Sequence, residues 1–291
     1  MITSPQQPAM QQSRPVPVTG TSSVTNVNLR VAQRLSALIV VLGAVASAGG
    51  LFMPSLYRGE TTWVVPQNRG QDLITLLAMP ILAVTLLAVR RGSARATLAW
   101  IGLLGYVCYT YAGAAFAFHF NEFFLIYVAL FSLSIFALIA AFTGIDVAAL
   151  RRTFDTHVPR RAVSIFLAVL GCMLTLMWVG QIIPFLTTGT LPDLIVRAAA
   201  PTNYVYVLDL GLVVPLALLG AFWLWRDMAW GYVVAGYILI KALTMGLALL
   251  GMTWFTVRAG EHVDPFLSGI WVVLAASSLG MTAWFLRHCR K

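Results

Sequence analysis

Lys241 is the residue of this sequence whose position most needs a chemical explanation. It lies within GYILIKALTMGLALLGM (residues 236–252), an otherwise apolar run long enough to cross a membrane. The only other lysine is the C-terminal Lys291. A charged side chain in the middle of a bilayer costs several kcal/mol, so Lys241 needs a partner or a function.

Asp209, in the preceding apolar run, is the candidate partner. Counting residues from the expected helix ends places Asp209 roughly 9 Å deep and Lys241 roughly 16 Å deep, and a lysine stem can reach several ångströms toward the interface. We therefore predict an ion pair in the outer half of the membrane. The pair could only neutralise two buried charges and fix the helix register. Alternatively, it lines an outward-facing cavity, where Lys241 contacts an anionic ligand or Asp209 exchanges a proton.

Other polar residues gather toward the same side of the membrane. Polar groups within membrane segments tend to face the bundle interior or water instead of lipid, so we take them as candidates for the same cavity. They are Asp72, Glu122, His119, Asn121, Tyr106, Tyr109 and Gln181. Tryptophans such as Trp178 are expected to be interfacial anchors.

The sequence lacks the residue patterns of several common kinds of site. The three cysteines are far apart with no CxxC spacing, and no histidine falls in mid-span, which argues against an iron–sulfur cluster or haem. No dinucleotide fingerprint, P-loop, HExxH or GxSxG motif occurs, so we assign no catalytic residue and no metal site. A lysine in the seventh span with an aspartate nearby is shared with retinal proteins, but eight spans depart from that pattern.

The composition indicates an all-α integral membrane protein. Of the 291 residues, 59% are hydrophobic and 10% charged, against roughly 25% charged in soluble domains. Residues 1–29 are rich in Pro, Gln, Ser and Thr and predict a disordered cytoplasmic tail. Eight apolar runs long enough to span follow, near 34–54, 72–89, 96–117, 122–143, 162–186, 204–224, 230–252 and 266–286.

The basic residues between the runs predict the orientation. Fourteen arginines and lysines fall on one side of the expected membrane, and four fall on the other: Arg58, Arg69, Arg197 and Arg258. The positive-inside rule places both termini in the cytoplasm, in what we expect to be a bacterial cytoplasmic membrane. The net charge of +9 is spread through short segments, which favours anionic headgroups over nucleic acid as its partner.

The sequence also predicts an internal repeat of four helices, with residues 30–158 as the first copy and 159–291 as the second. Spans two and six both begin Asp-Leu, at Asp72 and Asp209, and both carry a proline in their first half. Spans three and seven both contain Gly-Tyr, which adds Tyr237 to the candidates beside Tyr106. Because four is even, the copies would be parallel and related by an axis along the membrane normal.

These features favour a transporter-like protein with a polar cavity between its two repeats. The alternative is a structural, sensory or accessory membrane protein that uses Asp209 and Lys241 for packing, alone, as a homo-oligomer or with a partner subunit. An enzyme is less favoured; in one, His119, Glu122, Asp72 or Asp209 would act as acid or base. The ligand expected for a transporter is a small molecule or an ion.

Overall fold

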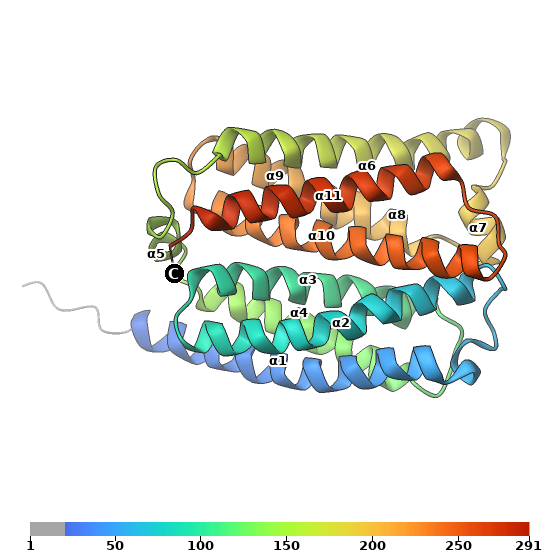
Figure 1. Ribbon diagram of the computed structural model, residues 1–291, viewed down its shortest axis with the longest axis horizontal. Coiled ribbons are helices and arrows are strands. Elements are labelled where there is room, and N and C mark those ends of the chain that lie inside the picture. Colours follow the sequence, from blue (N-terminus) through green and yellow to red (C-terminus); the bar gives the residue numbers. More distant parts are fainter. Residues whose placement is uncertain (1–20, 291) are drawn as a thin grey trace, which may run out of the picture.

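The computed structural model describes residues 21–290, with side chains from Val27 onward, and this part of the chain is helical. Eight of its helices, or runs of consecutive helices, are long and apolar enough to cross a membrane, which confirms a multipass membrane protein (Figure 1). The helices are α1 (Thr21–Phe52), η1 (Pro54–Tyr57), α2 (Val64–Arg90), α3 (Ala94–Ala117), α4 (Phe124–Gly144), α5 (Val147–Arg152), α6 (Arg160–Thr188), α7 (Asp193–Ala198), α8 (Tyr204–Leu208), η2 (Asp209–Val213), α9 (Val214–Trp225), α10 (Ala229–Arg258) and α11 (Pro265–Arg287). Helices α8, η2 and α9 together make the sixth span.

The N-terminal boundary differs from the prediction. Residues 21–29, which we expected to belong to a disordered tail, form the first turns of α1. No proline or glycine occurs between Gly20 and Arg30, so nothing in this stretch stops the helix from continuing beyond the apolar run. The rest of the predicted tail, residues 1–20, lies outside the described residues.

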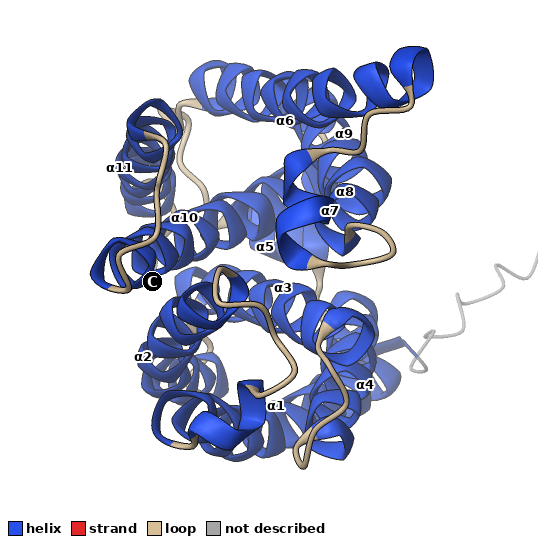
Figure 2. Cartoon of the chain, turned by 90° about the vertical axis from the view of Figure 1, so that its right-hand side faces the viewer, coloured by secondary structure: helices blue, strands red, loops and turns tan. Residues whose placement is uncertain are grey.

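The spans form two groups of four helices (Figure 2). In the first group α1 packs on α2 and α4, and α3 packs on both of these helices as well, which closes a ring. In the second group α6 packs on α9, α9 on α10, and α10 on α11. The ring is not closed there, because α6 and α11, unlike α1 and α4, do not pack extensively against each other.

Helix α10 joins the two groups by packing on α2 and α3. Glycines allow these helices to approach closely. A Cβ atom on Gly70 of α2 would collide with the backbone of α10 at Gly251 and Met252, and one on Gly105 of α3 would collide with the ring of Tyr237. Gly105 and Tyr237, one residue from each Gly-Tyr pair, therefore meet at the interface between the groups.

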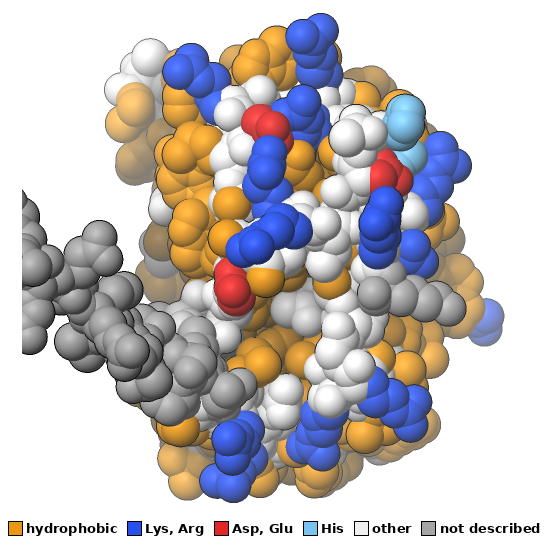
Figure 3. Space-filling view, turned by 90° about the vertical axis from the view of Figure 1, so that its left-hand side faces the viewer, with side chains coloured by type: hydrophobic (Ala, Val, Ile, Leu, Met, Phe, Trp, Pro, Cys, Tyr) orange, Lys and Arg blue, Asp and Glu red, His pale blue; other side chains and the backbone are white. Residues whose placement is uncertain are grey.

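Arginines gather at one end of the bundle (Figure 3). Helix α1 begins there and α11 ends there (Figure 1). At this end Asp227, between α9 and α10, pairs with Arg151 at 2.6 Å and with Arg160 at 2.8 Å. Arg151 belongs to α5, in the connection between the two groups, so these ion pairs fasten that connection to the second group.

Candidate functional site

The predicted ion pair between Asp209 and Lys241 is present. Lys241 Nζ lies 3.9 Å from Asp209 Oδ1, and the two side chains are only 6% and 8% exposed. Lys241 Nζ also lies 3.8 Å from the ring centroid of Tyr109, which belongs to α3 in the other group. The aromatic face attracts the ammonium, and more strongly in a desolvated site. The ammonium is thus held by groups from both halves of the protein.

The other carboxylate oxygen of Asp209 is held by Trp178 of α6, whose Nε1 donates to Oδ2 at 2.8 Å. Trp178 is 6% exposed, so the expectation that it is an interfacial anchor was wrong. A buried carboxylate needs hydrogen bonds as well as a counter-charge, and the indole N–H meets that need. Gln181, three residues later on α6, accepts a hydrogen bond from Tyr206 at 2.8 Å, and Tyr206 packs against Trp178.

Asp209 lies at an irregular turn of its span. Residues Asp209–Val213 form a π-helical turn in which the Val214 N–H donates to the Asp209 carbonyl. Pro215 follows directly; it has no N–H and its ring would crowd the carbonyl four residues earlier in a regular helix. The widened turn accommodates this proline, and such turns are frequent at functional sites.

The pair is enclosed by protein, so the outward-facing cavity that we predicted around it is not open in this structure. Tyr204 contributes to the enclosure from α8. A Cβ atom on Gly113 of α3 would meet the Tyr204 ring carbon Cζ at 2.7 Å, so this ring lies directly on α3. Lys241 is also farther from the end of its helix than predicted, because α10 continues to Arg258.

Asp72 lies in the first group and has different surroundings. Its Oδ2 accepts a hydrogen bond from Tyr57 Oη, and burial together with the neighbouring carboxylate raises the pKa of Tyr57 well above its ordinary value. Asp72 takes part in none of the ion pairs found in the described residues. The two acids that the repeat predicted to correspond therefore differ: one faces an ammonium and an indole, the other a tyrosine hydroxyl.

Tyr106 bonds α3 to α2 beside Asp72. Its hydroxyl accepts from Gln71 Nε2 at 2.7 Å and lies 2.9 Å from Thr75 Oγ1. Gln71 also donates to Thr110 at 3.1 Å. Thr110 lies four residues after Tyr106, as Lys241 lies four residues after Tyr237, so the predicted repeat pairs these two positions. A neutral hydrogen-bond network thus stands in the first group where the second has an ion pair.

His119, Asn121 and Glu122 lie in the connection between α3 and α4. They line a surface pocket of about 390 Å³ together with Phe120 and with Ser55, Leu56, Arg58 and Gly59. His119 Nδ1 is 3.3 Å from Glu60, and Asn121 donates to the Leu56 carbonyl at 3.1 Å. These contacts hold η1, whose Tyr57 bonds Asp72, against the end of the first group. The predicted candidates therefore do not all gather around the Asp209–Lys241 pair.

In the described residues no group of three or more His, Cys, Asp or Glu side chains could hold a metal ion. Comparisons with protein-family models, curated proteins and solved structures found no match for this chain.

Proposed function

We propose that the protein is transporter-like and moves an ion or a small charged molecule past the Asp209–Lys241 pair. The observation that carries this proposal is that Lys241 is bound from both helix groups, by Asp209 in one and by Tyr109 in the other. A relative movement of the two groups would separate the ammonium from the ring and expose the pair. The π-turn at Asp209 supports the proposal, because such turns are frequent at functional sites.

The test uses purified protein in liposomes on a solid-supported membrane, where currents are recorded after concentration jumps of protons, sodium, potassium or chloride. We expect a transient current for at least one of these ions with the wild type, and its loss in Lys241→Met. Asp264→Asn is the matched control, because Asp264 is an exposed helix cap on α11 far along the chain from the pair. Absence of any current with the wild type would contradict ion movement.

The second candidate is a structural, sensory or accessory subunit, and the enclosure of the pair favours it. A pair that only fixes helix register should keep its stabilising effect when the charges are exchanged. In that case the reciprocal variant Asp209→Lys/Lys241→Asp would keep normal expression and folding. A transporter would instead lose its current in the same variant, because the charge next to Tyr109 is reversed.

We further propose that the two helix groups are a 4+4 parallel repeat and that the arginine-rich end faces the cytoplasm of a bacterial cell. Two four-helix groups of similar order support the repeat (Figure 2). The arginines at the end where α1 begins and α11 ends support the orientation (Figure 3). Labelling of single cysteines at the two ends in intact cells with a membrane-impermeant maleimide checks this orientation.

A further inference from the structure

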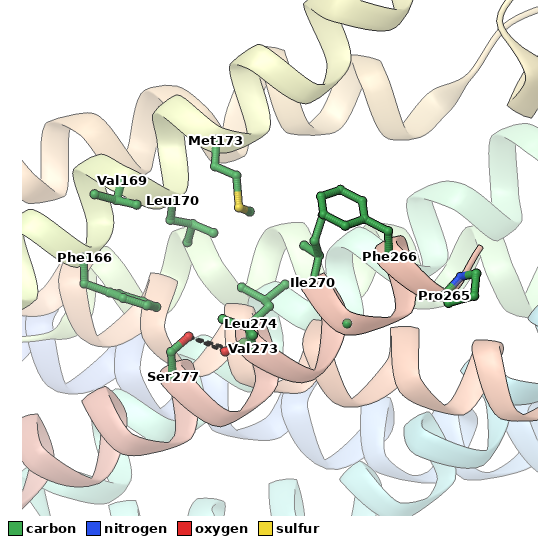
Figure 4. Close-up of a pocket in the computed structure, with 11 residues that line it drawn as sticks. Phe166, Val169, Leu170, Met173, Pro265, Phe266, Ile270, Val273, Leu274 and Ser277 are labelled. Atoms are coloured by element: carbon green, nitrogen blue, oxygen red, sulfur yellow. Dashed lines mark hydrogen bonds between the residues drawn. The ribbon is translucent and has the colours of Figure 1, made fainter. Parts of the chain in front are cut away.

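An apolar groove opens between α6 and α11, where the second helix group is not closed. It has a volume of about 510 Å³. The side chains of the two helices point toward one another across it (Figure 4). Its lining residues are Phe166, Val169, Leu170, Met173, Pro265, Phe266, Gly269, Ile270, Val273, Leu274 and Ser277.

The groove has an apolar floor and walls exposed to the membrane. Leu170 and Leu274 are 6% and 9% exposed, whereas Val273 is 67% exposed. The only polar side chain in the lining, Ser277, already donates its hydroxyl to the Val273 carbonyl at 2.6 Å. The lining side chains therefore present no free N–H or O–H donor, and the Ser277 oxygen is their one remaining strong acceptor. A buried water needs two to four polar partners, and the groove lies between two membrane-spanning helices, so a hydrocarbon occupant is favoured.

The size of the groove indicates which hydrocarbon fits. A methylene group is similar in size to a water molecule, which takes about 30 Å³ in the liquid, so the groove holds about 17 such groups. That is close to one phospholipid acyl chain. A transmembrane helix is about 10–12 Å wide and could insert only a few side chains into this volume.

The helix ends beyond the groove differ in the sign of their charge. Arg161 lies five residues before Phe166 on α6, and its guanidinium lies 5.8 Å from the ring centroid of Trp225 on α9. Arg287, the last residue of α11, lies ten residues after Ser277 at the same end of the bundle, and neither arginine has an acidic partner within 4 Å in the described residues. Asp264 caps α11 at the other end, beside Pro265. A phosphate-bearing headgroup is attracted to the arginine end and repelled from the acidic end.

We propose that the groove binds one acyl chain of an anionic phospholipid whose headgroup lies at the end marked by Arg161 and Arg287. The acyl chain fills the gap between α6 and α11. In the other group there is no such gap, because the corresponding helices, α1 and α4, pack directly on each other. This binding site is separate from the Asp209–Lys241 pair and does not depend on its function.

The experiment uses the full-length protein in nanodiscs of phosphatidylglycerol and phosphatidylcholine, with a photoactivatable group on the acyl chain of one lipid at a time. Cross-linked peptides are mapped by mass spectrometry. We expect labelling of segments 166–173 and 266–277 by phosphatidylglycerol to exceed, by several-fold, that of the exposed lipid-facing residues of α2, such as Leu77 and Val84. Equal labelling of the groove and α2 would overturn the proposal, and this comparison needs no variant.

Two glycines of α11 provide a matched pair of variants. A Cβ atom on Gly269, in the groove, or on Gly280, outside it, would meet no atom within 4 Å. Gly269→Phe should therefore fill the groove and reduce labelling several-fold, while Gly280→Phe should leave it unchanged. The double variant Arg161→Gln/Arg287→Gln should remove the preference for phosphatidylglycerol over phosphatidylcholine. A dimer in native mass spectra that Gly269→Phe dissociates would overturn the proposal in favour of a second copy of the chain.

Discussion

The two charges of the Asp209–Lys241 pair depend on each other, because neither is solvated by water. We expect Lys241→Met alone to lower the free energy of unfolding by about 3–5 kcal/mol, since it leaves an unpaired buried carboxylate. The double variant Lys241→Met/Asp209→Asn should recover most of that loss. Denaturant unfolding of wild type, both single variants and the double variant in detergent micelles measures the coupling directly. Single variants as stable as the wild type would show that the charges are not desolvated.

The sequence was sufficient to predict that Asp209 and Lys241 meet, because two charges in adjacent apolar runs have few other partners. It was not sufficient to predict their depth or their full surroundings. Trp178 was missed because tryptophan is common at membrane interfaces. The sequence did carry one signal that Trp178 faces the site: the polar residue Gln181 follows three residues later and lies on the same helix face. His119 and Glu122 were grouped with the pair because they are polar and lie near helix ends, but only their contacts place them at a separate surface pocket.

At the scale of elements, the spans of the two acids differ although both contain a proline. Asp72 precedes Pro80 by eight residues, and α2 continues as an α-helix through that proline. Asp209 precedes Pro215 by six residues, and the helix widens into a π-turn between them. A proline in an apolar run predicts a local disturbance, but whether the helix bends or widens depends on the side chains packed around it.

The connection between the two groups provides an element-scale prediction. Burial opposes the charge of Asp227, but hydrogen bonds from Arg151 and Tyr232 and the charge of Arg160 lower its pKa below the ordinary value. Asp227 has a φ of 60°, which asparagine also tolerates, so Asp227→Asn removes charge without new backbone strain. We expect this variant to be cleaved faster by trypsin between residues 151 and 161 at pH 7. Asp193→Asn, on the exposed α7, is the control.

The pH dependence of the same contact follows from the lowered pKa. A carboxylate whose pKa is lower in the folded protein stabilises it fully above the unfolded value of about 4, and the effect is lost as the pH falls through the folded value. Wild-type protection from proteolysis at this connection should therefore be constant from neutral pH to about pH 5 and should weaken below about pH 4. Asp227→Asn should show a smaller acid-dependent change, measured as cleavage with an acid-active protease. Part of the change should remain, because His288 also lowers the pKa of Asp155 in the same connection.

At the scale of the whole molecule, the number of spans could be predicted because apolar length alone decides it. The sequence did not predict that one helix group is closed and the other open, because closure depends on individual side-chain contacts. In α1, a Cβ atom on Gly43 or Gly49 would collide with Met79 of α2 or with Phe123 at the start of α4, respectively, so these glycines permit a closed ring. In α6, a Cβ atom on Gly180 would meet nothing within 4 Å. The groove between α6 and α11 lies where such close contacts between helices are missing.

The joint between the two groups gives a prediction for the whole molecule. Gly70 faces backbone atoms of Gly251 and Met252, which cannot rotate away as a flexible side chain could. We therefore expect Gly70→Leu to separate α2 from α10 and to cost at least about 1–3 kcal/mol, the usual range for overpacking. Gly180→Leu is the matched control, because a side chain there enters open space. Thermal unfolding of both variants in the same detergent measures the difference. Equal melting temperatures would mean that the two groups are not joined at Gly70.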